Sequence, residues 1–270
     1  MLLIIDFFKT RTTWANTYGS DAKSWGWFGL THILILLATV LFCAVMCYFY
    51  RKGDEKRRNI LRWVIMGLML AEEVWMFTIA IVTKQFEIGF LPLHLCGINI
   101  FFCIAYTIKQ KDWIAEILYG VALPGAFMAL IVPTWTAVPA WNFIFIFSTG
   151  YHIFLICYPI MLLAGGYKPD FKKLWKGAVV LVALCVVIFG INLFNNYMAE
   201  KTNDLVFWNS NFMFLNYPES LFLTFANLLG LKGRWYLISL PVLLCAIWVL
   251  FYAPWVIMEK MQAKKEVLTA

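Results

Sequence analysis

Charged residues are scarce in this sequence. Asp, Glu, Lys and Arg make up 14% of its 270 residues, whereas hydrophobic residues make up 63%. The mean hydropathy is +0.77. A soluble domain of this length cannot bury so much apolar surface in one core. The composition therefore excludes a soluble globule and predicts an integral membrane protein.

The sequence also lacks the alternation of apolar and polar residues that is typical of strands in membrane barrels. It contains instead seven apolar windows long enough to cross about 30 Å of hydrocarbon as helices. We therefore predict an all-α fold, a polytopic membrane bundle of seven transmembrane helices that forms a single domain over residues 1–270. The fourth window is the weakest, because it carries Glu116 and Pro124. The predicted spans are 26–50, 60–83, 90–108, 113–132, 141–164, 175–197 and 235–257.

Basic residues are concentrated in alternate connections between the predicted spans. Most of the 22 Lys and Arg residues follow the first, third, fifth and seventh spans, and the loop 133–140 has no charge. The positive-inside rule then predicts a multi-pass protein of the cell membrane with its N-terminus outside and its C-terminus in the cytoplasm. This bias accounts for the net charge of +7, so we infer no nucleic-acid partner.

Two segments outside the spans have helical character. The N-terminal stretch MLLIIDFFKTRTTW has too short an apolar run for a cleavable signal and predicts an interfacial helix on the outer surface. The outer loop 198–234 contains PESLFLTFANLLG, which predicts a short helix with Pro218 at its first position and Gly230 after its end. Loops of this length are commonly lids or binding loops.

Polar residues within the spans are few, and they gather in the outer half of the predicted bilayer. Because charged groups are costly in lipid, we expect them to face the bundle interior and to converge on one site, with Glu72 or Glu73 bonded to a histidine. The competing interpretation is that they only fasten helices together through hydrogen bonds. These residues are His32, His94, His152, Glu72, Glu73, Asn192, Asn195 and Asn196.

The seven cysteines lack any CxxC spacing, which argues against a disulfide framework or a zinc knuckle. Cys96 alone shares the outer layer with the histidines. A thiol near a histidine is a common nucleophile. His94 lies two residues before Cys96, about 200° around a regular helix, and is a poor base for it. We therefore expect the base to come from another helix, with His32 and His152 as the candidates.

The run LPLHLC at residues 91–96 resembles the signature of YwaF-like bacterial integral membrane proteins, which belong with the eukaryotic transmembrane protein 164 acyltransferases. The similarity extends over about residues 25–255. It includes the histidine of GLTHILILL, the glutamate of LAEEVW, the segment ALPGAFMALIVP, the histidine of STGYHIFLICY and the stretch NFMFLNYP. The Asn–aromatic–Met element of the family is matched both by NNYM at 195–198 and by NFMF at 211–214.

This resemblance implies a thioester-forming acyltransferase that acts on a phospholipid or another acyl lipid, with Cys96 as nucleophile and His152 as base. His152 would take the thiol proton, and the acyl group would pass from Cys96 to a hydroxyl group or to water. Asn99 could donate to the oxyanion, or it could only bond another helix. The mechanism uses no cofactor and no metal.

Two other functions remain open from the sequence. One is a zinc-dependent seven-helix lipid hydrolase of the ceramidase-like kind, although its expected HxxxH spacing is absent. The other is a transporter or binding protein for a small solute, although the chain shows no internal repeat.

Overall fold

The computed structural model describes residues 2–19, 24–203, 207 and 210–269. Over these residues the protein is helical and contains no strand, as the sequence predicts. The elements are α1 (Leu2–Phe7), α2 (Arg11–Tyr18), α3 (Leu30–Lys52), α4 (Glu55–Val82), η1 (Ile88–Phe90), α5 (Leu95–Lys109), α6 (Asp112–Ile117), η2 (Leu118–Ala122), α7 (Leu123–Ile131), α8 (Phe143–Ala164), η3 (Phe171–Lys173), α9 (Leu174–Thr202), η5 (Phe212–Phe214), α10 (Ser220–Leu228), η6 (Gly233–Trp235) and α11 (Tyr236–Thr269).

Seven helical segments are long and apolar enough to cross a membrane, which confirms the predicted bundle. Each one overlaps the span expected at that place. The segments are Leu30–Lys52, Glu55–Val82, Ile88–Lys109, Asp112–Ile131, Phe143–Ala164, Phe171–Thr202 and Gly233–Gln262.

The fourth span is the most deeply enclosed of the seven. In its most apolar stretch 72% of the residues are buried, compared with 61% for α8 and 17% for the sixth and seventh spans. Its polar and helix-breaking residues are tolerated because neighbouring helices, not lipid, surround them. A π-helical turn, η2, precedes Pro124 and leaves the Gly120 carbonyl available, and the indole of Trp248 donates to that carbonyl at 2.6 Å.

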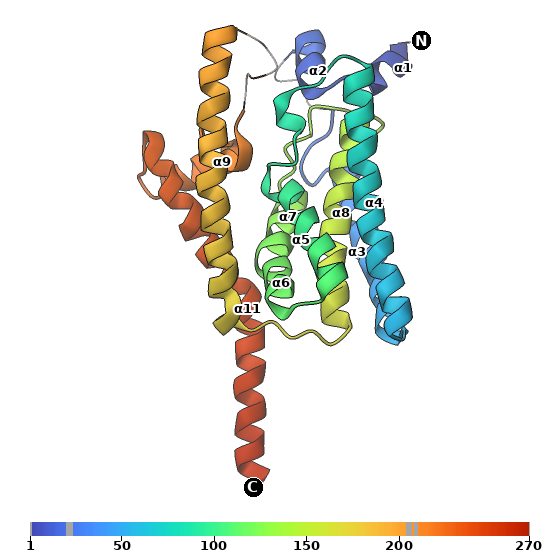
Figure 1. Ribbon diagram of the computed structural model, residues 1–270, viewed down its shortest axis with the longest axis vertical. Coiled ribbons are helices and arrows are strands. Elements are labelled where there is room, and N and C mark those ends of the chain that lie inside the picture. Colours follow the sequence, from blue (N-terminus) through green and yellow to red (C-terminus); the bar gives the residue numbers. More distant parts are fainter. Residues whose placement is uncertain (1, 20–23, 204–206, 208–209, 270) are drawn as a thin grey trace.

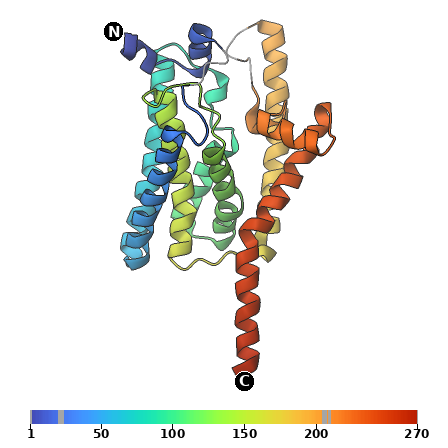
Figure 2. The same ribbon diagram turned by 180° about the vertical axis from the view of Figure 1, so that it is seen from behind.

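The helices form a bundle around α8 and this fourth span. Figure 1 shows α3 and α4 on one side of α8, α5 to α7 in the middle, and α9 to α11 on the far side. The helices α1 and α2 lie at one end, which we call the α2 end. At the opposite end the last turns of α11 project beyond the other helices, as Figure 2 also shows.

A buried carboxylate ties the helices together near the opposite end. Glu116 is fully buried and accepts hydrogen bonds from the hydroxyl groups of Tyr167 and Tyr252 and from the backbone N–H of Asp170. These donors come from the loop after α8, from α11 and from the start of the α9 region. A carboxylate with three donors is well satisfied, and it joins three parts of the chain at this end.

The N-terminal segment forms two short helices, α1 and α2, where the sequence predicts one, and the long loop contains the predicted helix with one correction. The apolar stretch 220–228 forms α10, but Glu219 is its N-cap, so Pro218 lies before the helix and not at its first position. Gly230 follows the helix with φ +70°, a conformation that glycine adopts without strain.

Candidate functional site

The chain makes a sharp turn immediately before Cys96. The predicted third span is not continuous here: η1 ends at Phe90, His94 is the N-cap of α5, and Cys96 is the second residue of that helix. Pro92 folds back against the first turn of α5. A Cβ added to Gly97 would lie 2.6 Å from the Cα of Pro92, so only glycine permits this close approach.

The sulfur of Cys96 therefore lies at the N-terminal end of a helix. The backbone N–H groups of Cys96 and Gly97 belong to the first turn of this helix. These groups have no intrahelical acceptor, and together with the helix dipole they attract negative charge. Cys96 is half-buried, whereas Cys103 on the same helix is fully buried.

Tyr151 of α8 connects Cys96 to a glutamate. Its hydroxyl group donates to the Cys96 carbonyl at 3.4 Å, and the carboxyl group of Glu73 on α4 interacts with the same hydroxyl. The sequence predicts that Glu72 or Glu73 bonds a histidine, but no such bond is found among the described residues, and the partner of Glu73 is a tyrosine. Sequence reasoning missed Tyr151, although it directly precedes His152.

His152 is held in one orientation by α8 itself. Its Nδ1 lies 2.6 Å from the carbonyl of Ser148, and its ring stacks on Trp135 with centroids 5.1 Å apart and planes at 19°. A carbonyl only accepts, so Nδ1 carries the proton, and in the neutral ring Nε2 is then an acceptor. No hydrogen bond to Nε2 is found among the described residues. His152 thus has the form of a general base.

His32 is bonded at both ring nitrogens and has no free one. It is fully buried, its Nε2 donates to the Leu130 carbonyl at 2.7 Å, and its Nδ1 accepts from the backbone N–H of Phe28 at 2.8 Å. The ring therefore fastens α3 to the end of α7. Among the described residues, no hydrogen bond connects His32 to Cys96.

His94 faces the long loop. Its Nδ1 accepts from the backbone N–H of Met213 at 3.4 Å, and its ring lies against Phe212 and Phe214. His94 is the N-cap and precedes the helix. The angle of about 200° between His94 and Cys96, which assumed a regular helix, therefore does not apply.

The predicted asparagines divide into two groups. Asn99 on α5 is 1% exposed, and its Oδ1 has no partner among the described residues. Asn192 on α9 accepts from the N–H of Phe212 and donates to its carbonyl, at 3.0 and 2.9 Å. Asn195 donates to the hydroxyl of Ser210 at 3.0 Å. The α9 pair therefore anchors the long loop over α5, whereas Asn196 is only half-buried.

Glu72 has a different environment from Glu73. Its carboxylate lies against Gly150 of α8, in the space that a Cβ at that position would occupy, and its Oε2, like that of Glu73, has no partner among the described residues. Glu72, Glu73 and Tyr151 thus bring α4 and α8 together beside the start of α5.

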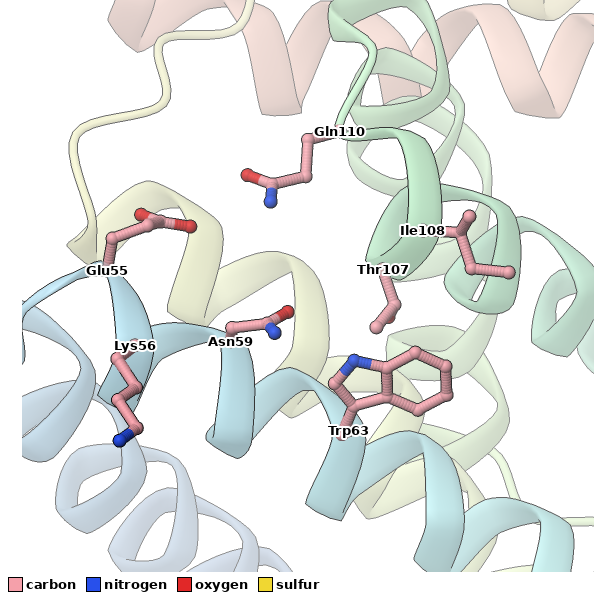
Figure 3. Close-up of a pocket in the computed structure, with 7 residues that line it drawn as sticks. All are labelled: Glu55, Lys56, Asn59, Trp63, Thr107, Ile108 and Gln110. Carbon is pink, nitrogen blue, oxygen red and sulfur yellow. The ribbon is translucent and has the colours of Figure 1, made fainter.

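A groove of about 430 Å³ lies at the other end of α5, far from this site. Figure 3 shows Glu55, Asn59 and Trp63 of α4 across from Thr107 and Gln110. Thr107 is eleven residues after Cys96, about 16 Å along the helix. Within the described parts of the chain, no three His, Cys, Asp or Glu side chains are grouped to hold a metal ion.

Comparison with known proteins gives one match. The model of the TMEM164 family matches residues 27–252. No curated protein and no solved structure matches the chain. The match confirms the family resemblance seen in the sequence, whereas the narrower YwaF-like assignment stays a prediction.

Proposed function

Since the chain belongs to the TMEM164 family and forms a bundle of seven apolar helices, we propose that it is a membrane-embedded lipid acyltransferase that works through a thioester on Cys96. The observation that carries this proposal is the surroundings of Cys96. The thiol lies at the start of α5, and the residue that contacts its backbone, Tyr151, directly precedes His152.

The chemistry follows from these positions. Nε2 of His152 takes the thiol proton, and the sulfur attacks the ester carbonyl of a lipid. The tetrahedral oxyanion is stabilised by the N–H groups at the start of α5, and the lipid alcohol leaves with the proton from the imidazolium. In the second step a hydroxyl group of another lipid, or water, attacks the thioester and regenerates the thiol.

We also propose that the α2 end faces the outside of the cell. The support is the distribution of Lys and Arg, which are concentrated in the connections at the opposite end, together with the positive-inside rule. The site at Cys96 then lies in the outer half of the bilayer, where a lipid of the outer leaflet presents its ester.

Intact mass spectrometry of the protein incubated with phospholipid tests the proposal. We expect one acyl adduct on the wild type and on Cys103→Ser, the control on the same helix, and none on Cys96→Ala. His152→Gln should slow formation of the adduct by about 100-fold or more, as expected for the loss of a general base. An adduct on Cys96→Ala, or none on the wild type, would overturn the proposal.

A further inference from the structure

A second groove, of about 580 Å³, lies between the C-terminal ends of α3 and α8. Figure 1 shows these two helices side by side, with both ends at the end of the bundle opposite α2. The volume is typical of a site for a small molecule. Much of the lining is small or apolar: α3 contributes Ala44 and Cys47, and α8 contributes Leu163 and Ala164.

Arg58 holds the two helix ends together beside this groove. Its guanidinium donates to the carbonyls of Tyr50 and Arg51 in the last turn of α3, at 3.0 and 3.2 Å. It also donates to the carbonyl of Gly165, the C-cap of α8, at 3.3 Å. The last carbonyls of a helix have no partner within it, so one side chain satisfies both ends. These contacts give the groove a fixed shape without a ligand.

Arg51 brings a positive charge to the lining of the groove. Its side chain is exposed, and the described residues include no ion pair of Arg51 within 4.0 Å. Lys52 adds a second positive charge beside it, since its Nζ donates to the hydroxyl group of the lining residue Tyr48 at 3.1 Å. No Asp or Glu of the described residues lines the groove. Its charge therefore favours an anionic ligand.

The groove at the end of α5 has a different charge. Its lining includes Glu55 as well as Lys56. Glu55 is paired with Arg62 at 2.7 Å, and Figure 3 shows its carboxylate on the side that faces Gln110. An anion in that groove would meet this carboxylate, so the groove between α3 and α8 is the better site for an anion.

We propose that the groove between α3 and α8 binds a phospholipid with a net negative headgroup, with the phosphate on Arg51 and an acyl chain along Ala44 and Ala164. A guanidinium bonds two phosphate oxygens at once, which suits arginine to this role. The positive-inside rule predicts that this end faces the cytoplasm. Anionic lipids are enriched in the cytoplasmic leaflet, and basic pockets between helices on that side commonly hold their headgroups.

A second copy of the chain fits the groove less well. A two-fold contact uses the same surface on both copies, so it would place Arg51 and Lys52 of each copy in one interface. The like charges would repel each other. A phospholipid instead supplies a negative charge for the basic residues and an apolar chain for the rest of the lining.

Binding of ether lipids tests the inference without any reaction at Cys96. Dialkyl ether phosphatidylglycerol is anionic, and dialkyl ether phosphatidylcholine with the same chains is zwitterionic. By native mass spectrometry of the full-length protein, we expect the wild type to bind the anionic lipid more tightly than the zwitterionic one. Arg51→Gln should weaken binding of the anionic lipid about tenfold, or about 1.4 kcal/mol, and leave the zwitterionic lipid unchanged.

Two further variants separate the groove from the general charge of this end. Arg57→Gln makes the same change at an exposed arginine that does not line the groove, and it should match the wild type. Ala44→Leu keeps every charge but fills part of the apolar lining at an exposed position, and it should also weaken binding of the anionic lipid.

Four outcomes would overturn the inference. The first is equal binding of the anionic lipid by the wild type and Arg51→Gln. The second is an equal loss for Arg51→Gln and Arg57→Gln, which would indicate only a general attraction to the basic end. The third is stabilisation of the wild type by inorganic phosphate without any preference for the anionic lipid, which would assign Arg51 to free phosphate. The fourth is a dimer that Ala44→Leu dissociates while lipid binding stays unchanged, which would make the groove an interface between copies. Because neither ether lipid contains an ester, failure of the proposed acyl transfer would not affect this result.

Discussion

At the scale of single residues, the three histidines differ in which ring nitrogens are free. His32 uses both nitrogens to join α3 and α7, and His94 uses Nδ1 to hold the backbone of the long loop. His152 uses Nδ1 to bond its own helix, and its Nε2 has no hydrogen-bond partner in the part of the chain that the structure describes. The same residue type therefore has a structural task at His32, whereas the environment of His152 is compatible with the chemical role that we propose for it.

Replacing His32 should affect stability more than chemistry. His32→Ala leaves the Leu130 carbonyl and the Phe28 N–H without their partner, and each unsatisfied buried group costs about 1–3 kcal/mol. We expect a lower melting temperature in detergent and, in the fraction that stays folded, acylation of Cys96 at nearly the wild-type rate. His152→Gln should show the reverse pattern. An unchanged melting temperature for His32→Ala would contradict the structural role.

Gly150 permits the Glu72 carboxylate to reach α8. The methyl group of Gly150→Ala would occupy the position of a carboxylate oxygen, and overpacking of this kind costs about 1–3 kcal/mol. We expect a lower melting temperature and slower acylation, because Tyr151 and His152 follow directly. The control is Gly67→Ala on α4, where an added Cβ meets no atom within 4 Å and should cause little change. Equal melting temperatures for the two variants would show that this contact does not constrain the helices.

At the scale of elements, the position of the long loop depends on α9. The side chain of Asn192 accepts from the backbone N–H of Phe212 and donates to the carbonyl of the same residue. The hydroxyl group of Ser210 donates to Oδ1 of Asn192 at 3.1 Å. The next residue, Met213, contacts His94 at the start of α5. One buried asparagine thus connects α9 through the loop to the segment that presents Cys96.

Removing this anchor should free the loop. Asn192→Leu deletes both bonds to Phe212, and we expect faster hydrogen exchange at the amides of Phe212 and Met213, together with earlier cleavage between residues 210 and 219 in limited proteolysis. Asn196→Leu, one helical turn further along α9, is the control and should leave both measurements unchanged. Equal protection of the loop in Asn192→Leu and the wild type would contradict the anchoring role.

At the scale of the whole molecule, the two ends differ in composition. The α2 end carries the N-terminal helices, whereas the opposite end carries the basic connections and the projecting turns of α11 (Figure 2). By the positive-inside rule, we expect the end with the basic connections to face the cytoplasm.

A reporter fused after residue 270 tests this orientation. We expect a fluorescent protein at this position to fluoresce, because it folds in the cytoplasm, and an alkaline phosphatase to be inactive there. The same two reporters fused before residue 1 provide the comparison and should give the opposite pattern. An active phosphatase at the C-terminus would invert the assignment and place Cys96 in the inner half of the bilayer.

The sequence by itself determined the membrane class, the seven spans and the short list of polar residues within them. Each of these follows from local composition: a helix in lipid must be apolar over about 20 residues, so its limits can be read from a window of that length. The fourth span shows where this reasoning weakens. Glu116 and Pro124 made it the weakest apolar window in the sequence, although it is the most deeply buried of the seven spans in the structure.

Only the tertiary structure decided the partners. The bond from His32 to Leu130, the tyrosine between Glu73 and Cys96, and the contact of the long loop with His94 all depend on residues far apart in the chain. The physical reason is that a hydrogen bond is directional and short, so it depends on how helices rotate and where a loop returns. No periodicity within a single span contains that information.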